Sequence, residues 1–324
     1  MTGRSSVNTS TVRKTTSVVL FMIGTMASLA TVLGFFGATW WGWDRIADWR
    51  FPLLLILVVT SIIYGFGFRR AFSAVFLLAA IVNAVLLAPL WLSTQSAPES
   101  SDRLRVVSFD TSGSGDHRKD IAAWIHSVEA DVALLYRTTG DWADTLATVG
   151  IPYRIVPAAV GSDAPGQATV LVRGEVAVRP LTPVPGSDLT LLVDLASTQV
   201  TLIGLAVQNP GSTFEADRRI ARFTSINAAV AESTEPVVVA GNLETSRWSH
   251  AFDVIADGLD NSEDGFGYAA TWPRTDPPLI GAYVGLPLDH ALYRGSITVP
   301  SRRVGPDLGP AHRPLLFDVS PAAE

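Results

Sequence analysis

The chain has 324 residues, of which 48% are hydrophobic, and its formal net charge at pH 7 is −6. This hydrophobic fraction is above that of most soluble globular proteins, which predicts that part of the chain lies in a lipid bilayer. The absence of cysteine excludes disulfides, thiolate nucleophiles, zinc–cysteine sites and iron–sulfur clusters.

The charge is divided unevenly along the chain. Residues 1–93 contain seven Lys or Arg and two acidic residues, whereas the remainder contains 17 basic and 28 acidic residues, a net charge of −11. A domain with this balance repels a phosphate backbone and lacks the basic stripe that nonspecific nucleic-acid binding requires. The composition therefore predicts no nucleic-acid partner and disfavours a nuclease.

Three uncharged apolar runs occupy residues 17–39, 51–68 and 71–92. At a rise of about 1.5 Å per residue, runs of this length cross, or nearly cross, a hydrocarbon core of roughly 30 Å. We therefore predict an N-terminal tail at 1–16 and a three-helix transmembrane region at 17–93. Arg13 and Lys14 also make a cleaved signal peptide an alternative for the first run. Its length, the lack of a small-x-small cleavage site, and the tryptophans at 40, 41, 43 and 49 favour an anchor with an interfacial aromatic belt.

Short basic segments indicate the orientation in the membrane. Arg4, Arg13 and Lys14 precede the first run, and Arg69 and Arg70 separate the second from the third. Basic residues in short loops favour the cytoplasmic side. We therefore expect a multi-pass cell-membrane protein with a cytoplasmic N-terminus and an extracytoplasmic C-terminal domain.

The expected partners are the lipid bilayer and a protein of the membrane or cell envelope. Asn83 lies within the third run, where we expect it to make a hydrogen bond between helices, with a functional polar contact as the alternative.

A Ser- and Pro-containing linker at 94–103 precedes a soluble domain at 104–324, which opens as a strand–helix–strand unit. An apolar run at 104–109 predicts a strand, 111–115 a turn, and 131–136 a second strand. Between them, Ile121, Trp124, Ile125 and Val128 have the spacing of one helix face.

Six further short runs predict strands and one long run predicts a helix. The helix covers 214–232, and the strands lie at 169–172, 189–194, 200–207, 237–240, 290–293 and 315–319. Many strands with few helices between them favour two packed sheets flanked by helices.

Several isolated features are interpreted as structural. The glycine-rich segment 161–166 lacks a phosphate-binding Lys and a following helix, so a plain turn is favoured over a phosphate loop. His117, His126 and His250 have no ligand spacing and are expected at the surface. His290 is expected to face away from its neighbour Asp289 because side chains alternate along a strand.

Six short motifs occur in order along the domain: Leu104-Arg-Val-Val-Ser-Phe-Asp110, Asp131-Val-Ala-Leu-Leu-Tyr-Arg137, Val238-Val-Ala-Gly-Asn-Leu-Glu244, Thr271-Trp-Pro273, Leu288-Asp-His290 and Gly309-Pro-Ala-His-Arg-Pro-Leu315. With these motifs the domain resembles the endonuclease/exonuclease/phosphatase superfamily, and the three preceding spans resemble a bacterial membrane-anchored subgroup. The resemblance implies a four-layer αββα sandwich. It also implies a magnesium-dependent attack of water on a phosphoester, assisted by a His–Asp pair.

The motifs depart from the family pattern at the positions that carry the chemistry. Asp110 stands for an Asn, Arg137 for the metal-binding Glu, Asn242 for the catalytic Asp, and Glu244 for its Asn partner. The Ser-Asp before the last His is Pro310-Ala311, and the His expected near the end of the 200–207 strand is Ala206 or Val207. Asp289 and His312 are the remnant of the reactive set.

Two interpretations of the site follow from these substitutions. In the favoured one, Arg137 lies in the cleft and pairs with Asp110 and Glu244, and no metal is bound. In the other, Asp110, Asn242 and Glu244 hold a relocated Mg²⁺ or Mn²⁺ ion and Arg137 binds substrate phosphate. The Asp289–His312 pair then either only satisfies a buried imidazole or serves catalysis.

The first interpretation predicts a catalytically degenerate pseudoenzyme that acts as an extracytoplasmic binding or assembly module. The second predicts a metal-dependent phosphodiesterase or phosphatase acting on an envelope or lipid-linked phosphate compound.

Overall fold

The computed structural model of the protein describes residues 9–67, 70–93, 102–113, 117–174, 176–195, 198–273 and 284–322. Arg4, Arg69, most of the expected linker at 94–103 and part of the expected turn at 111–115 lie outside the described residues. The chain divides into two compact units, Met1–Ala88 and Pro89–Glu324.

The first unit is helical. Its elements are α1 (Thr9–Leu33), the 3₁₀ helix η1 (Gly34–Thr39), α2 (Trp41–Ala47), α3 (Arg50–Gly67) and α4 (Arg70–Leu87). Three stretches are long and apolar enough to cross a membrane, namely Lys14–Thr39, Arg50–Gly67 and Arg70–Leu87. The predicted number of apolar helices is therefore confirmed.

The first unit differs from the prediction in two places. The segment between the first and second apolar runs, which contains the tryptophans of the expected aromatic belt, includes the helix α2. The third run was expected to continue to residue 92, but α4 ends at Leu87. Pro89 lacks a backbone N–H and so cannot continue the hydrogen-bond ladder. The short α5 (Pro89–Leu92) belongs to the second unit, where Gly265 N donates to Pro89 O (3.2 Å) and Gly267 N to Leu90 O (2.7 Å).

Polar side chains join the helices of the first unit. Asn83 is fully buried, and its Nδ2 donates to Thr31 Oγ1 at 2.8 Å, which is the hydrogen bond between helices that the sequence predicted. The buried Arg50 donates from Nη1 to Thr31 O at 2.7 Å, and its guanidinium carbon lies 4.4 Å from the centre of the Phe35 ring. These contacts pair Asn83 Nδ2 and Arg50 Nη1, which would be costly to leave unpaired among apolar helices.

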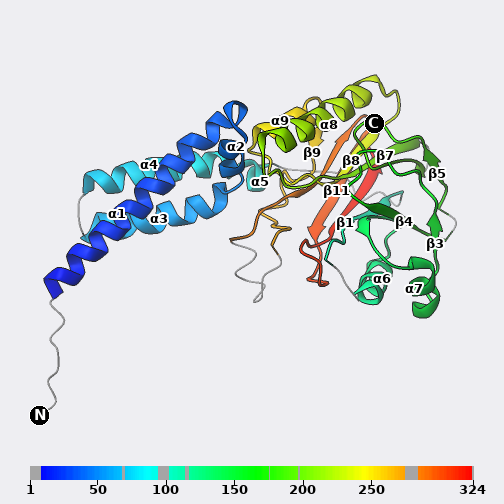
Figure 1. The fold of residues 1–324 in the computed structure, drawn as a ribbon, viewed down its shortest axis with the longest axis horizontal. Helices are drawn as coiled ribbons and strands as arrows, with labels where there is room; N and C mark the ends of the chain where they lie inside the picture. The colour runs from blue at the N-terminus through cyan, green and yellow to red at the C-terminus, as the bar shows by residue number, and fades with distance from the viewer. Residues whose placement is uncertain are drawn as a thin grey trace, which may run out of the picture. The chain divides into compact units, whose positions relative to one another are not determined.

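The second unit is built on two six-stranded mixed sheets (Figure 1). The first sheet has the order β11 (Ile297–Val304), β12 (Leu315–Pro321), β1 (Leu104–Asp110), β2 (Val132–Thr138), β4 (Gln167–Arg173) and β3 (Tyr153–Val156). The second has the order β5 (Val178–Leu181), β6 (Leu189–Leu195), β7 (Thr198–Ala206), β8 (Val237–Asn242), β10 (Asp289–Arg294) and β9 (Asp260–Asn261).

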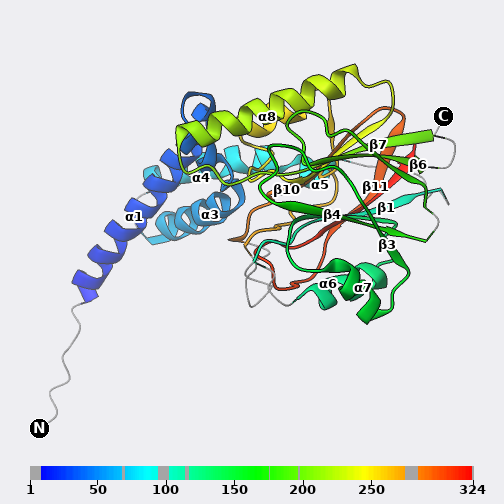
Figure 2. The ribbon, with the colours of Figure 1, turned by 45° about the vertical axis from the view of Figure 1, so that its right-hand side comes forward.

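Apolar side chains fill three spaces between four layers. Between the sheets, Val106 and Leu134 of the first sheet and Leu202 and Val238 of the second belong to one buried cluster. A second cluster joins the first sheet to α6 (Arg118–Ser127) and α7 (Trp142–Val149), and a third joins the second sheet to α8 (Thr213–Glu232) and α9 (His250–Ala256) (Figure 2). The predicted αββα sandwich, preceded by three apolar helices, is confirmed.

Several short elements were not predicted from the sequence, namely α7, α9, β3, β5, β9 and β11. Most are too short to establish a period. In β11, Pro300 and two arginines interrupt the alternation, and the pairing with β12 shifts register between Thr298 and Ser301. Asp141 caps α7 by accepting from Asp144 N at 3.0 Å, a local signal that was visible in the sequence.

Candidate functional site

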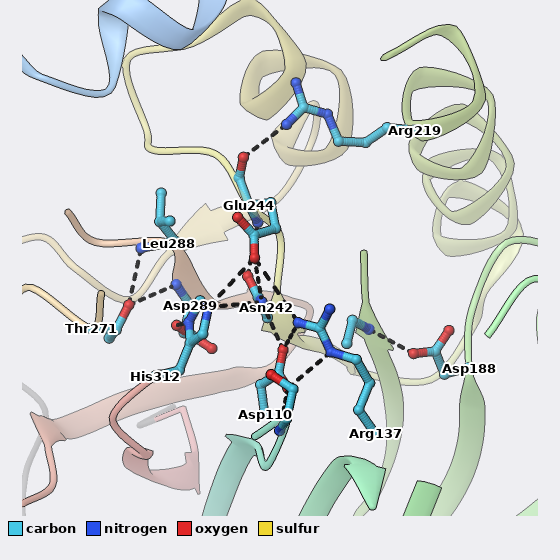
Figure 3. Close-up of polar contacts among 12 residues, drawn as sticks. Asp110, Arg137, Asp188, Arg219, Asn242, Glu244, Thr271, Leu288, Asp289 and His312 are labelled. Atoms are coloured by element: carbon cyan, nitrogen blue, oxygen red, sulfur yellow. Dashed lines mark hydrogen bonds and ion pairs between the residues drawn. The ribbon is translucent and has the colours of Figure 1, made fainter. Parts of the chain in front are cut away.

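Six side chains that the sequence motifs identified lie close together in the structure (Figure 3): Asp110, Arg137, Asn242, Glu244, Asp289 and His312. Strands β1 and β2 are parallel, as are β7 and β8, and the ends of such strands meet at one edge of a sheet. Asp110 is the last residue of β1 and Asn242 is the last residue of β8. Asp289 is the first residue of β10, where it pairs with Asn242. Arg137 lies near the end of β2, and Glu244 lies two residues after the end of β8. His312 lies in the loop before β12.

The backbone departs from regular structure at Arg137 and Glu244. Arg137 lies where the β2–β4 pairing shifts register between Tyr136 and Thr138, and its φ is +52°. Such a bulge redirects a side chain. Glu244 has φ +48° and donates its backbone N–H to Asn242 Oδ1 at 2.9 Å. A positive φ is uncommon for side chains of this size, and two of the three described non-glycine residues that adopt it, Arg137 and Glu244, belong to this network.

The fully buried Asp110 carboxylate accepts four hydrogen bonds. Oδ1 accepts from Arg137 Nε (2.9 Å) and from Ser112 N (3.0 Å). Oδ2 accepts from Arg137 Nη2 and from Asn242 Nδ2 (2.8 Å). A carboxylate offers about four lone-pair positions, so Asp110 has none left for another ligand. The Arg137–Asp110 contact is bidentate, the strong geometry for a guanidinium and a carboxylate.

Glu244 shares one oxygen with three neighbours. Its Oε1 lies 3.0 Å from Asn242 Nδ2, 3.4 Å from His312 Nε2 and 4.0 Å from Arg137 Nη2. Burial tends to raise the pKa of this carboxyl, but the hydrogen bond and charge of His312, with Asn242 and Arg137, outweigh it and lower the pKa. Glu244 is therefore ionised at neutral pH.

His312 lies between two carboxylates. Its Nδ1 is 2.7 Å from Asp289 Oδ2, and Thr271 Oγ1 holds the Asp289 backbone by accepting its N–H at 3.1 Å. Burial opposes protonation of the ring, but Asp289 and then Glu244 overcome it and raise the pKa of His312 to about 9. At neutral pH the ring is an imidazolium that bridges the two acids.

A second buried cluster lies next to Asp289 in the chain. His290 Nδ1 is 3.1 Å from Glu263 Oε1, and Arg302 Nη2 is 3.2 Å from the same oxygen. His290 Nε2 contacts Thr245 O at 2.7 Å, whereas Asp289 contacts His312. The two neighbours thus point to different partners, as the strand alternation predicted. Burial acts to raise the pKa of Glu263, but His290 and Arg302 lower it to about 2.

The remaining predictions for isolated residues also have clear outcomes. His117, His126 and His250 are exposed, as expected. In the glycine-rich segment 161–166, Ala164 N donates to Gly161 O at 3.1 Å, which is a turn.

Three charged residues that border this network, Asp188, Arg219 and Arg222, were not predicted from the sequence. The buried Asp188 accepts from Arg222 Nη2 at 2.6 Å and from Ala206 N at 2.6 Å, and Ala206 is one of the two positions, with Val207, at which the resemblance implies a His. Arg219 Nη1 donates to the Glu244 carbonyl at 2.8 Å (Figure 3). The spacing of Arg218, Arg219 and Arg222 in the expected helix was the available signal.

The donor set does not suit the divalent ion that the resemblance implies. Mg²⁺ takes six oxygen ligands in near-octahedral geometry. Among the described residues, Asp289 Oδ1 is a buried carboxylate oxygen of the network without a hydrogen-bond partner, and the Asp289 and Glu244 carboxylates both already contact His312. The Arg137 guanidinium lies beside Asp110, and Ala311 contributes no carboxylate.

Comparisons with known proteins agree with this architecture. The fold is similar to that of D. rerio TDP2 humanized by 14 mutations, with a TM-score of 0.52 and 13% sequence identity over 68% of this chain and 100% of that one. It is also similar to truncated Caenorhabditis elegans TDP2, with a TM-score of 0.51 and 14% identity over 67% of this chain and 98% of that one. At such identities the likeness establishes the fold alone.

No curated protein matches the chain in sequence. The model of the Endonuclease/Exonuclease/phosphatase family, however, matches residues 107–320, which is well over half of the chain. Together with the two-sheet sandwich and the ordered motifs, this match establishes that the chain belongs to the Endonuclease/Exonuclease/phosphatase family.

Proposed function

We propose that this protein is a membrane-anchored, non-hydrolytic member of its family that acts as a binding or assembly module on the extracytoplasmic side of the membrane. The observation that carries the proposal is the bidentate pair between Arg137 and the fully buried Asp110. The resemblance assigns the Arg137 position to a metal-binding carboxylate. A fixed cation there supports a site stabilised by internal charge pairing.

Electrostatics favour this interpretation over a relocated metal site. A guanidinium about 4 Å from a divalent ion opposes it by roughly 8 kcal/mol at an effective dielectric constant near 20. Asp110 offsets the Arg137 charge but has no lone pair left for an ion. To hold a metal, the site would first have to break the Arg137–Asp110 pair.

The extracytoplasmic location is inferred from the basic residues near the apolar helices. Lys14 begins the first apolar stretch and Arg70 begins α4, so the positive-inside rule places both on the cytoplasmic side. With three crossings, the second unit then lies on the opposite side. A protein of the membrane or envelope is the partner that this location makes accessible.

A second function, a metal-dependent phosphodiesterase or phosphatase, has one observation in its favour. The buried Asp289 Oδ1 accepts no hydrogen bond from the described residues. This carboxylate oxygen could contribute to an ion site if Arg137 moved away to bind substrate phosphate.

A nucleic-acid substrate is less well supported. One structurally similar protein, D. rerio TDP2, was solved in complex with a single-strand DNA product, but its identity to this chain is 14%. Residues 94–324 carry 17 basic and 28 acidic side chains, a balance that repels a polyanion.

The test uses the full-length protein in nanodiscs. Mg²⁺ and Mn²⁺ are titrated calorimetrically, and hydrolysis of bis(p-nitrophenyl) phosphate is followed with each ion. We expect no saturable metal binding up to about 10 mM and no metal-dependent turnover. Micromolar to millimolar metal binding together with hydrolysis would instead establish the enzyme.

A restored variant provides the positive control. Arg137→Glu, Asn242→Asp, Glu244→Asn and Ala311→Asp together return the family's residues at these four positions, so this variant should gain metal binding. The matched triple variant retains Arg137 and should bind metal much more weakly. If the triple variant binds as tightly as the quadruple one, the guanidinium is not what prevents metal binding.

A further inference from the structure

A cavity of about 260 Å³ lies at the first turns of α8 and borders the Asp110–Arg137 network through Arg219, which donates to the Glu244 carbonyl. Its walls are the turn at residues 162–165, the segment after β7 that contains Val207, and three arginines of α8, Arg218, Arg219 and Arg222. Ligand pockets usually hold at least about 300 Å³, so this one suits a small group. The clustering of three guanidinium groups points to an anion.

Two of the three arginines are held in place by the protein. Arg222 donates from Nε to Gly186 O (2.8 Å) and from Nη2 to Asp188 Oδ1 (2.6 Å). Arg219 is largely buried and donates from Nη1 to Glu244 O (2.8 Å). Their orientation is therefore set before any ligand arrives, which reduces the entropy lost on binding.

The third arginine is free to move toward a ligand. The Arg218 side chain is 61% exposed, and its nearest acidic partner is the exposed Asp163 at 3.9 Å. An exposed pair at this distance is weak, so a ligand anion can compete with Asp163. Phe214, one turn earlier on α8, is 71% exposed, and its ring centre lies 6.0 Å from the Arg218 guanidinium carbon.

The cavity lining contains three arginines and two carboxylates, Asp163 and Glu215, and a third carboxylate, the buried Asp188, is paired with Arg222. Glu215 Oε2 accepts from Gly211 N at 2.6 Å and thus serves the start of the helix. The first turn of the 20-residue α8 adds the positive end of the helix dipole. Asp163 is the acidic group that a ligand would have to displace.

We propose that this cavity binds the phosphate group of a small phosphorylated ligand. Arg219 and Arg222 form its fixed base, Arg218 closes over the anion, and Phe214 offers an apolar surface to the rest of the molecule. Guanidinium groups match phosphate geometry with paired hydrogen bonds. The inference rests on the proposed binding function for its role, since it gives that module a ligand class.

The test is calorimetry on the full-length protein in phosphatidylcholine nanodiscs and phosphate-free buffer. One arm titrates inorganic phosphate, and the other titrates dihexanoyl phosphatidic acid below its micelle concentration. We expect saturable binding in at least one arm, weakened about tenfold by Arg218→Gln because one charge-assisted contact is lost. Arg218 is exposed, so this variant should retain its fold.

Arg103→Gln is the matched control, because Arg103 is another exposed arginine with a single carboxylate partner at 3.5 Å. Binding that is absent in both arms, or that Arg103→Gln weakens as much as Arg218→Gln, overturns the proposal. Phe214→Ser separates the sources: weaker lipid binding with unchanged phosphate binding identifies a lipid headgroup, and equal effects identify a free phosphate compound.

The metal titration described above separates this inference from the proposed function. Hydrolysis by the wild-type protein would overturn the non-hydrolytic function and leave phosphate binding at Arg218 intact. If the wild-type protein binds neither phosphate nor metal, the phosphate site is overturned and the non-hydrolytic function stands.

Discussion

The Arg137–Asp110 pair is the contact whose removal tests the proposed site most directly. Arg137→Met removes the guanidinium and keeps much of the apolar stem. The Asp110 carboxylate then stays fully buried with two of its four donors, Asn242 Nδ2 and Ser112 N. Removing one partner of a buried ion pair costs about 3–5 kcal/mol. The Arg137 side chain is 19% exposed, which admits some water and favours the lower end, about 3 kcal/mol.

The predicted loss is measurable by thermal unfolding. For a unit of this size, 1 kcal/mol corresponds to about 2–4 °C in Tm, so Arg137→Met should lower the Tm of the second unit by roughly 6–12 °C. Differential scanning fluorimetry of the full-length protein in detergent measures this shift. Asp110→Leu combined with Arg137→Met removes both charges and should recover most of the loss.

Two results would refute this reasoning. Arg103→Met, at an exposed arginine, should change stability by less than about 0.5 kcal/mol; an equal loss from this control means that burial of the pair is not the cause. A loss below about 0.5 kcal/mol for Arg137→Met itself means that the pair does not stabilise the site.

Three further changes test other parts of the structure. The pKa of His312 is raised from 6.5 to about 9. The contribution of protonated His312 to the free energy of unfolding is therefore complete below pH 6.5 and is lost as the pH rises through 9. Stability should fall by up to about 3 kcal/mol across that window, and His312→Gln should remove this dependence in pH-resolved unfolding. Glu263→Gln leaves the buried Arg302 guanidinium without its carboxylate partner and should cost about 3–5 kcal/mol in thermal unfolding; a near-neutral variant would contradict the importance of that cluster. In the helical unit, Asn83→Leu removes the bond to Thr31 and should lower stability by about 1 kcal/mol in SDS unfolding, whereas greater stability would show that the bond contributes little.

Much of the architecture could be predicted because it depends on local patterns. Uncharged runs of 18 or more residues indicated three membrane-length helices, and alternation with short apolar runs indicated strands. The order of six motifs then indicated the four-layer sandwich. Short elements such as β11 were missed because Pro300 and a register shift erase the alternation that identifies a strand.

The candidate site was predictable as a set of residues, but its bonds were not. The sequence shows that Arg137 stands where the family has a carboxylate. It also shows that Asp110 and Glu244 are available to pair with this arginine. Whether the guanidinium meets Asp110 depends on the bulge at Arg137 and on its positive φ. Neither feature has a local sequence signal.

Residue identity alone thus determined which charges this protein has available, and the tertiary structure decided which of them meet. Asp110 and Asn242 are 132 positions apart, and their hydrogen bond exists because two sheets pack with their strand ends at one edge. The arginines of α8 were likewise visible as a basic cluster, but Gly161 N donating to Asp188 O at 2.7 Å places the turn that encloses them. Side-chain contacts across such separations follow from sheet packing, because no local periodicity specifies the distance between them.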